Sequence, residues 1–244
     1  MGIAYNTSVV RDGLVLHLDA ANVKSYPGSG TNFFNIAKPN QNLRGVLAGG
    51  ALEISGGIVF DGTDDGIRVF NSDLNSYTVG DDVNISPTTN FTIEQTFKPT
   101  FLQTDSYYSL RNQLLRKGQG ASTLNFWTQI DTDTTFKFYV RSNAENLKSV
   151  MFNTPSMTNN VNTVTIIVNN LSIECYHNGQ YMGQQTMNSN PVAAYTNDTM
   201  GIGDFGVSQT YFTGTYYDCK LYNRTLTDAE IHQNFEALRG RYGI

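Results

Sequence analysis

Charged residues and cysteines are both scarce in this chain of 244 residues, and each shortage argues against certain partners or structural features. Only 15% of the residues are charged, the net charge is −5, and no run of lysine or arginine occurs. Without a basic run the chain lacks the usual footprint for a nucleic-acid backbone, so nucleic acid is not an expected partner. No apolar run approaches the roughly 20 residues of a membrane helix, so we expect no membrane insertion.

The first residues and the two cysteines give related expectations about the compartment. The start MGIAYNTSVV has neither a basic beginning nor a long apolar run, so no signal peptide is predicted and synthesis in the cytoplasm is expected. Cys175 and Cys219 each alternate with apolar residues. Because no export signal points to an oxidising compartment, we predict that both are free thiols in the core.

What the chain does contain is a series of short strand patterns. Segments rich in β-branched and aromatic residues alternate with polar ones and are separated by turns such as DGTDDG, HNGQ and GDFG. Asn178-Gly179 is the preferred pair for a tight hairpin. These patterns predict an all-β protein with two antiparallel sheets in a jelly-roll β-sandwich. We expect one domain over residues 1–244, with its core at about 13–223.

The C-terminal residues predict a short α-helix and tail over about 227–244. Thr227 and Glu230 have the spacing of a capping box, in which each side chain bonds to the other residue's backbone N–H. An apolar stripe follows at helical spacing. It consists of Ile231, Phe235 and Leu238. Gly240 is predicted to end the helix in the left-handed conformation.

The order of several motifs resembles that of the laminin-G-like, or concanavalin A-like, lectin/glucanase superfamily. The matching pieces include IVFDGTDDGIRV, FTIEQTFKP, IECYHNGQYMG and the ending YNRTLTDAEIHQNFEALRGRYGI. The ending is especially similar to tailed-bacteriophage structural proteins. The resemblance implies a non-enzymatic virion protein on the capsid or tail surface, held by contacts with other virion proteins. It leaves homo-oligomerisation open.

A carbohydrate-binding adhesin is the alternative, and it depends on one hairpin. The segments LNFWTQI and TFKFYVRS each place apolar residues on one face. The opposite face carries Trp127, Tyr139, Asn125, Gln129 and Arg141. An aromatic plate bordered by amides and a cation suits a sugar ring, which has apolar faces and hydroxyl edges.

A glycan hydrolase is the weakest alternative, because such enzymes need two carboxylates flanking the scissile bond. Glu94 stands with threonines on its strand face, and Asp131 and Asp133 fall in a polar turn. We interpret all three as solvated surface residues. The sequence therefore predicts no catalytic residues and no enzyme.

No cofactor is required by the sequence, but the resemblance implies one metal. Many members of the superfamily hold a structural Ca²⁺ through an Asp in the last core strand, which corresponds to Asp218, and Asp19 is a plausible neighbour. The acidic stretch FDGTDDG opens like an EF-hand loop, yet strands rather than helices flank it. We therefore interpret that stretch as a hairpin turn.

Overall fold

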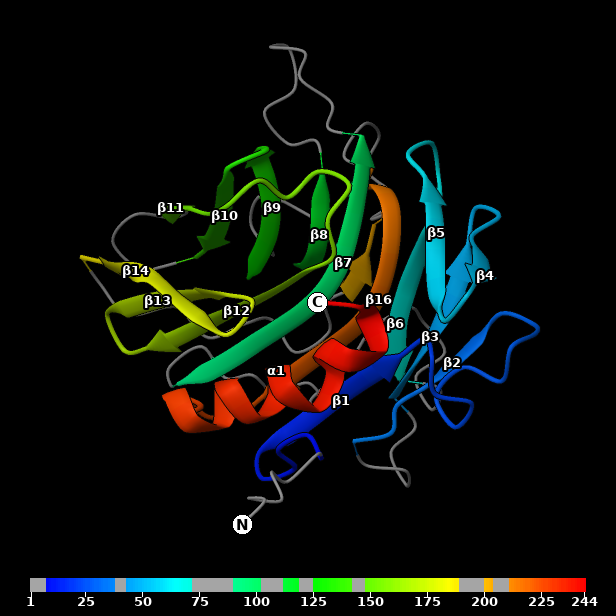
Figure 1. Cartoon of the computed structure of the whole chain (residues 1–244), viewed down its shortest axis with the longest axis horizontal. Coiled ribbons are helices and arrows are strands. Elements are labelled where there is room, and N and C mark those ends of the chain that lie inside the picture. The colour runs from blue at the N-terminus through cyan, green and yellow to red at the C-terminus, as the bar shows by residue number, and fades with distance from the viewer. Residues whose placement is uncertain are drawn as a thin grey trace.

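The computed structural model describes residues 8–37, 43–71, 90–101, 112–118, 125–141, 148–188, 200–203 and 211–244. Their strands form two antiparallel sheets of eight strands each, and one helix, α1 (Asp228–Tyr242), follows. The sheet beneath α1, called the helix-side sheet, runs in the order β14 (Gln180–Thr186), β13 (Ser172–His177), β12 (Asn162–Asn169), β7 (Phe91–Phe101), β16 (Thr213–Tyr222), β5 (Gly57–Asp61) and β4 (Leu52–Ile54), with β1 (Leu14–Asp19) also beside β16. The second sheet runs in the order β11 (Lys148–Asn153), β10 (Thr135–Val140), β9 (Phe126–Thr132), β8 (Gln113–Lys117), β15 (Met200–Ile202), β6 (Gly66–Asn71), β3 (Leu43–Ala48) and β2 (Asn32–Phe34). The predicted jelly-roll sandwich is confirmed, and Figure 1 shows the helix-side sheet in front of the other.

Aromatic side chains from both sheets fill the space between them. Phe97 stacks on Phe136 with ring centroids 6.3 Å apart, and Phe91 lies 5.8 Å from Phe126. Rings of this size remove large apolar areas from water and dominate the energetics of a core. Cys175 and Cys219 are buried, unpaired members of the same cluster, as predicted.

Strand β16 organises the helix-side sheet because it has different neighbours along its two halves. One edge pairs with β7, while the other pairs first with β5 and then with β1. The second pairing sets Asp19 directly opposite Asp218. Two carboxylates in that position repel each other unless cations lie close by.

A β-bulge in β16 decides which side chains face outward. The register against β7 shifts between Tyr216 and Asp218. As a result both Tyr216 and Cys219 lie in the core, whereas Tyr217 packs against Tyr242 of α1. Simple alternation along the strand would place Tyr217 on the same face as Cys219, but the bulge inserts one residue and turns Tyr217 to the opposite face.

The acidic stretch at residues 61–66 joins the two sheets and does not form a hairpin. Strand β5, before it, pairs with β4 and β16, while β6, after it, pairs with β3 and β15. The hairpin prediction is therefore wrong. The carboxylates act as local acceptors: Asp65 accepts from the Asp61 N–H at 2.9 Å, and Asp61 accepts from the Thr63 N–H at 2.7 Å.

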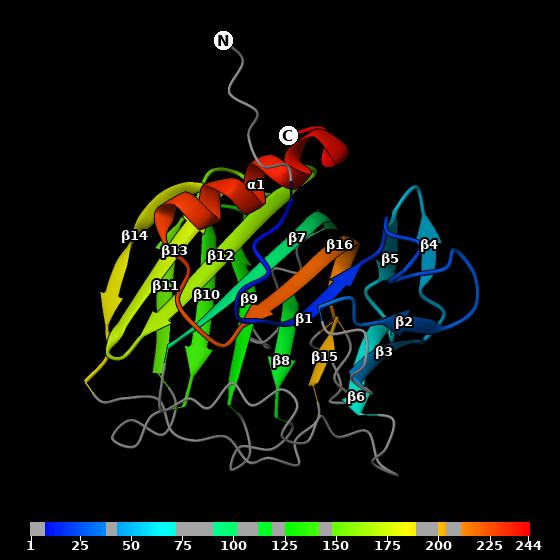
Figure 2. The ribbon, with the colours of Figure 1, turned by 90° about the horizontal axis from the view of Figure 1, so that it is seen from below.

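Helix α1 lies across the outer face of the helix-side sheet (Figures 1 and 2). It begins with the predicted capping box of Thr227 and Glu230. It continues through Gly240 to Tyr242, and Gly243 adopts the left-handed conformation with φ of 72°. The predicted end at Gly240 is wrong, since a helix interior tolerates glycine at a cost of about 1 kcal/mol. Within the described residues, no helix combines the length and apolar character needed to cross a membrane.

The turn between β13 and β14 has the predicted geometry. Asn178 and Gly179 both have positive φ, of 50° and 75°. This is the conformation of a type I′ turn, whose twist matches that of the strands it joins. The turn reaches the side of α1, where Gly179 faces the ring of Phe235.

Candidate functional site

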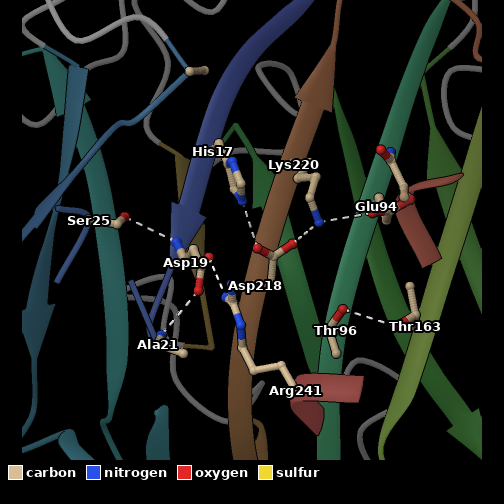
Figure 3. Close-up of polar contacts among 12 residues, drawn as sticks. His17, Asp19, Ala21, Ser25, Glu94, Thr96, Thr163, Asp218, Lys220 and Arg241 are labelled. Carbon is tan, nitrogen blue, oxygen red and sulfur yellow. Dashed lines mark hydrogen bonds and ion pairs between the residues drawn. The ribbon is translucent and has the colours of Figure 1, made fainter. Parts of the chain in front are cut away.

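A buried network of charged side chains lies between the helix-side sheet and α1 (Figure 3). Asp218 and Lys220 come from β16, Glu94 from β7 and His17 from β1. The Lys220 ammonium contacts Asp218 and donates to Glu94 Oε1 at 2.9 Å. His17 Nε2 lies 2.8 Å from the second oxygen of Asp218. All four side chains are almost completely removed from solvent.

The pKa values show how these charges support one another. Burial by itself lowers the pKa of Lys220, but Asp218 and Glu94 outweigh that effect and raise it well above its usual value. Burial by itself raises the pKa of Asp218, but Lys220 and His17 lower it to about 2. Asp218 is therefore ionised at neutral pH, and His17 Nε2 carries the proton of their hydrogen bond.

The burial of Glu94 corrects one prediction. We interpreted it as solvated surface, yet it is 1% exposed and lies directly opposite Lys220 in the sheet register. The interpretation failed because α1 covers this face, and the sequence gives no direct measure of what covers a strand. Lys220 was also not identified from the sequence as a partner of Asp218. The signal was present, because residues 218 and 220 are two apart on one strand and so share a face.

Two polar side chains of α1 anchor the helix to this network. Asn234 donates to Glu94 Oε2 at 3.3 Å and to the Tyr222 hydroxyl at 3.0 Å. Arg241 donates to Asp19 Oδ2 at 2.6 Å. Hydrogen bonds to charged groups are among the stronger ones in proteins. These bonds therefore fix where α1 lies, and α1 in turn forms a wall of the pockets beside it.

The residues predicted to hold calcium do not fit a divalent ion. His17, Asp19 and Asp218 each place a possible ligand atom within 4.8 Å of the others. However, the Lys220 ammonium already pairs with Asp218, whose second oxygen bonds to His17, and Arg241 already pairs with Asp19. A calcium ion needs its oxygens at about 2.3–2.6 Å, so it would have to displace Arg241 from Asp19 and bind Asp218 beside the completely buried Lys220 ammonium. Asp218 and Asp19 thus serve as partners of protein cations.

The five residues of the predicted glycan site do lie near one another in the second sheet. Trp127 and Tyr139 are cross-strand partners whose rings stack with centroids 3.9 Å apart. Trp127 Nε1 also donates to Gln129 Oε1 at 3.3 Å. Yet Trp127 is only 5% exposed, and Asn125 and Gln129 are buried, whereas Arg141 is half-buried. The indole thus packs within the protein and offers no open plate of the kind a sugar ring would cover.

A pocket of about 620 Å³ lies beside the buried network. Its walls come from residues 8, 9 and 11 before β1, from β1 itself, from residues 22, 24 and 34–37, and from the C-terminal half of α1, so we call it the β1–α1 pocket. Arg11, Lys24 and Arg241 contribute three cationic side chains, against the single carboxylate of Asp19. The pocket is therefore locally positive on a chain whose net charge is −5.

Phe34 lies at the wall of this pocket and is 43% exposed. Its position is fixed from beneath, because the Ser25 hydroxyl donates to the Phe34 carbonyl at 2.7 Å and accepts from the Asp19 N–H at 3.0 Å. Asn35 ties the same segment to β1 by accepting from the His17 N–H at 2.9 Å and donating to the Val15 carbonyl at 3.0 Å. Sequence reasoning missed this pocket, since nothing local connects residues 11, 24, 34 and 241.

The two facing sheets and the outer helix define a lectin-like β-sandwich. A model of the concanavalin A-like lectin/glucanases superfamily matches residues 71–232, and the chain belongs to this superfamily. A search of curated protein sequences found no match.

Three solved structures illustrate the likeness in fold. The binding domain of Paraclostridial Mosquitocidal Protein 1 is 16% identical, with a TM-score of 0.67 over 92% of this chain and 52% of that one. The binding domain of botulinum neurotoxin serotype D is 15% identical, with a TM-score of 0.64 over 93% and 52%. Trypanosoma rangeli sialidase is 16% identical, with a TM-score of 0.63 over 94% and 33%. The chain thus spans about half the length of the two binding domains and a third of the sialidase.

Proposed function

We propose that the chain is a non-enzymatic carbohydrate-binding module that holds an acidic sugar residue in the β1–α1 pocket. The observation that carries this proposal is the exposed ring of Phe34 in the same pocket as Arg11 and Lys24. Within the described residues, neither of these two cationic side chains has a partner. An aromatic ring packs against the apolar face of a sugar, and free cations pair with its carboxylate or sulfate.

The size and rigidity of the pocket support binding of a small ligand. Its volume of about 620 Å³ lies within the usual range for small-molecule sites. Ser25 and Asn35 hold the Phe34 segment in place before any ligand arrives. A wall that is already ordered loses less conformational entropy on binding, which favours affinity.

The comparisons support a binding role in general terms. The superfamily name includes lectins, and two of the structural neighbours are named as binding domains, one of them of a neurotoxin. Because one fold hosts many functions, the proposal depends on the residues of the pocket and not on this likeness.

The state of the carboxylates supports a role without catalysis. Glu94 and Asp218 are committed to Lys220, and Asp131 pairs with Lys137 at 2.6 Å. Hydrogen bonds from Ser156 and Thr158 lower the pKa of Asp133 to about 2, which keeps it ionised and unsuited to act as a general acid.

The virion role stays a prediction. Neither the superfamily match nor the structural neighbours bear on a phage particle, on capsid or tail proteins, or on a homo-oligomer. Mass spectrometry of purified particles tests it, and absence of the chain from them would rule it out. A glycan-binding module on a particle surface would satisfy both hypotheses.

Binding to an array of sialylated, sulfated, uronic-acid and neutral glycans tests the proposed function. We expect acidic glycans to bind and neutral ones of the same size to bind at least tenfold more weakly at this pocket, since about 1.4 kcal/mol corresponds to a factor of ten. Phe34→Ala and Lys24→Gln should each weaken binding of the acidic ligand by about tenfold in titration calorimetry. The first change removes the apolar platform, and the second removes a charge-assisted hydrogen bond.

Two variants serve as matched controls. Val23→Ala removes an apolar side chain that is 77% exposed in the same segment but does not line the pocket. Arg239→Gln removes a cation of α1 that also lies outside the pocket. Both should bind as the original chain does. Equal losses in the controls, or no acidic ligand on the array, would contradict the proposal.

A further inference from the structure

A second pocket, of about 630 Å³, lies on the other side of α1 and differs in chemistry from the first. Its walls are residues 155–156 and 159–162, residues 177–178 and 180 at the β13–β14 turn, Phe235 of α1, and residues 243–244 after the helix. Side-chain amides dominate the lining, and no Asp, Glu, Lys or Arg side chain contributes among the described residues. We call it the amide pocket.

Several of its amide groups have hydrogen-bonding capacity left over. Asn178 Oδ1 accepts from the Thr163 N–H at 2.8 Å, which leaves its NH₂ group without a partner in the described part of the chain. Asn160 donates to the Ser156 carbonyl at 3.1 Å, which leaves its oxygen. The side chains of Asn159 and Gln180 make no hydrogen bond to any described residue. Donors and acceptors therefore both remain available around the pocket.

The inner part of the pocket is fixed by a fully bonded amide. Asn162 is 1% exposed, its Oδ1 lies 2.8 Å from His177 Nε2, and its NH₂ group donates to the Met157 and Asn160 carbonyls at 2.9 and 2.6 Å. Because Oδ1 is an amide oxygen and can only accept, His177 Nε2 is the donor of the first bond. The walls that carry the free amides are thus held in place by bonds beneath them.

Phe235 closes the helix side of the pocket. A Cβ built on Gly179 would lie 3.1 Å from the ring, so glycine is what lets the hairpin turn approach it this closely. The ring is half-buried, which leaves part of it open to the pocket. An aromatic surface beside unpaired amides is an arrangement that suits a hydroxyl-rich, uncharged ligand.

We propose that the amide pocket is a second carbohydrate site, selective for a neutral sugar residue. Hydroxyl groups both donate and accept, so they can satisfy the free NH₂ and C=O groups, while a charged ligand would meet no opposite charge among the described side chains. This site lies beyond the proposed function, because its residues and its ligand differ from those of the β1–α1 pocket. Since α1 contributes Phe235 to one pocket and Arg241 to the other, a branched glycan could engage both.

Titration of ¹⁵N-labelled protein with methyl glucoside, methyl galactoside, methyl mannoside and sodium sialyllactose tests this inference. We expect at least one neutral glycoside to shift the side-chain amide signals of Asn159, Asn178 and Gln180. Gln180→Ala and Asn159→Gly should each weaken that binding by about fivefold to tenfold, the loss of one hydrogen bond. Glycine is chosen at position 159 because φ there is 61°, a conformation that glycine adopts without strain.

Gln184→Ala is the matched control, since Gln184 is exposed on the same strand but does not line the pocket. It should leave the neutral titration unchanged, and Gln180→Ala should leave binding of sialyllactose at the β1–α1 pocket unchanged. Shifts confined to other surfaces, no shift with any neutral glycoside, or equal binding by the Gln180 and Gln184 variants would overturn the inference. Failure of the acidic ligand to bind would count against the β1–α1 pocket alone.

Discussion

Replacement of Lys220 by Met should lower the free energy of unfolding by about 3–5 kcal/mol, the usual cost of breaking a buried ion pair from one side. Lys220 is completely buried and faces both Asp218 and Glu94. Methionine has a similar length but no charge, so two carboxylates would remain buried with less compensation. Urea unfolding followed by tryptophan fluorescence measures the change, because the chain has a single Trp.

Lys137→Met is the matched control for this experiment. Lys137 also pairs with an acid, Asp131, at 2.6 Å, but the two side chains are 18% and 25% exposed. A partly solvated pair of this kind contributes only about 0–1 kcal/mol. If both variants lost the same stability, burial would not be what makes the Lys220 network strong. Adding Asp218→Asn and Glu94→Gln to Lys220→Met should recover part of the loss, because it removes the unpaired charges.

Acidification from pH 6.5 to pH 4 should cost the protein about 2–3 kcal/mol through His177, at about 1.4 kcal/mol for each unit of pKa difference. Burial lowers the pKa of His177 from 6.5 to about 4. The unfolded chain therefore binds more protons than the folded protein within this range. The contribution is fully present above pH 6.5 and is lost as the pH falls through 4.

Unfolding measured at intervals across this range, with His177→Gln beside the original chain, tests the expectation. Glutamine can still donate to Asn162 but does not titrate, so the part of the pH dependence of stability that His177 contributes between pH 6.5 and 4 should disappear. His232→Gln is the control, since its side chain is 59% exposed. An unchanged slope in the His177 variant would contradict the expectation.

Asp218 affects stability in a separate pH range. Its pKa of about 2 means that its contribution to stability is lost only as the pH falls from about 4 towards 2.

The same histidine links stability to the amide pocket. His177 lines that pocket and bonds Asn162, which in turn holds the Asn160 carbonyl. A charged imidazole at this buried position would disturb those bonds. Because burial lowers the pKa of His177 in the folded protein to about 4, binding of a neutral sugar should weaken only as the pH falls through about 4.

Local signals in the sequence were sufficient to predict most of the strands and the helix. Alternation placed most strands, Asn178-Gly179 located the hairpin, and Thr227 with Glu230 located the start of α1. Each of these signals acts within a few residues, so no knowledge of distant contacts is needed to read it. The wrong predictions arose where the same local sequence pattern is compatible with two different structures. A bulge at Tyr217 reverses alternation, and the acidic stretch at residues 61–66 can turn back within a sheet or cross to the other one.

The candidate binding pockets and the buried ionic network were much harder to predict from the sequence than the fold. Trp127 and Tyr139 were correctly expected to be neighbours, because cross-strand pairing follows from the hairpin. Their burial was not foreseeable, and the open plate they were expected to form is absent at Trp127. Arg11, Lys24 and Phe34 carry no motif, and only the packing of β1 against the end of the chain brings them to one pocket.

The sequence by itself thus determined the class of fold, the free thiols and the capped helix, since these follow from periodicity and short-range hydrogen bonding. Only the tertiary structure decided which polar residues are buried and which are open. Lys220 and Glu94 are 126 positions apart, and their partnership depends on the β16–β7 register and on the helix that covers them. The physical reason is that the burial of a charge is a property of what packs over it, and here α1 both seals the ionic network and forms a wall of the two pockets on its sides.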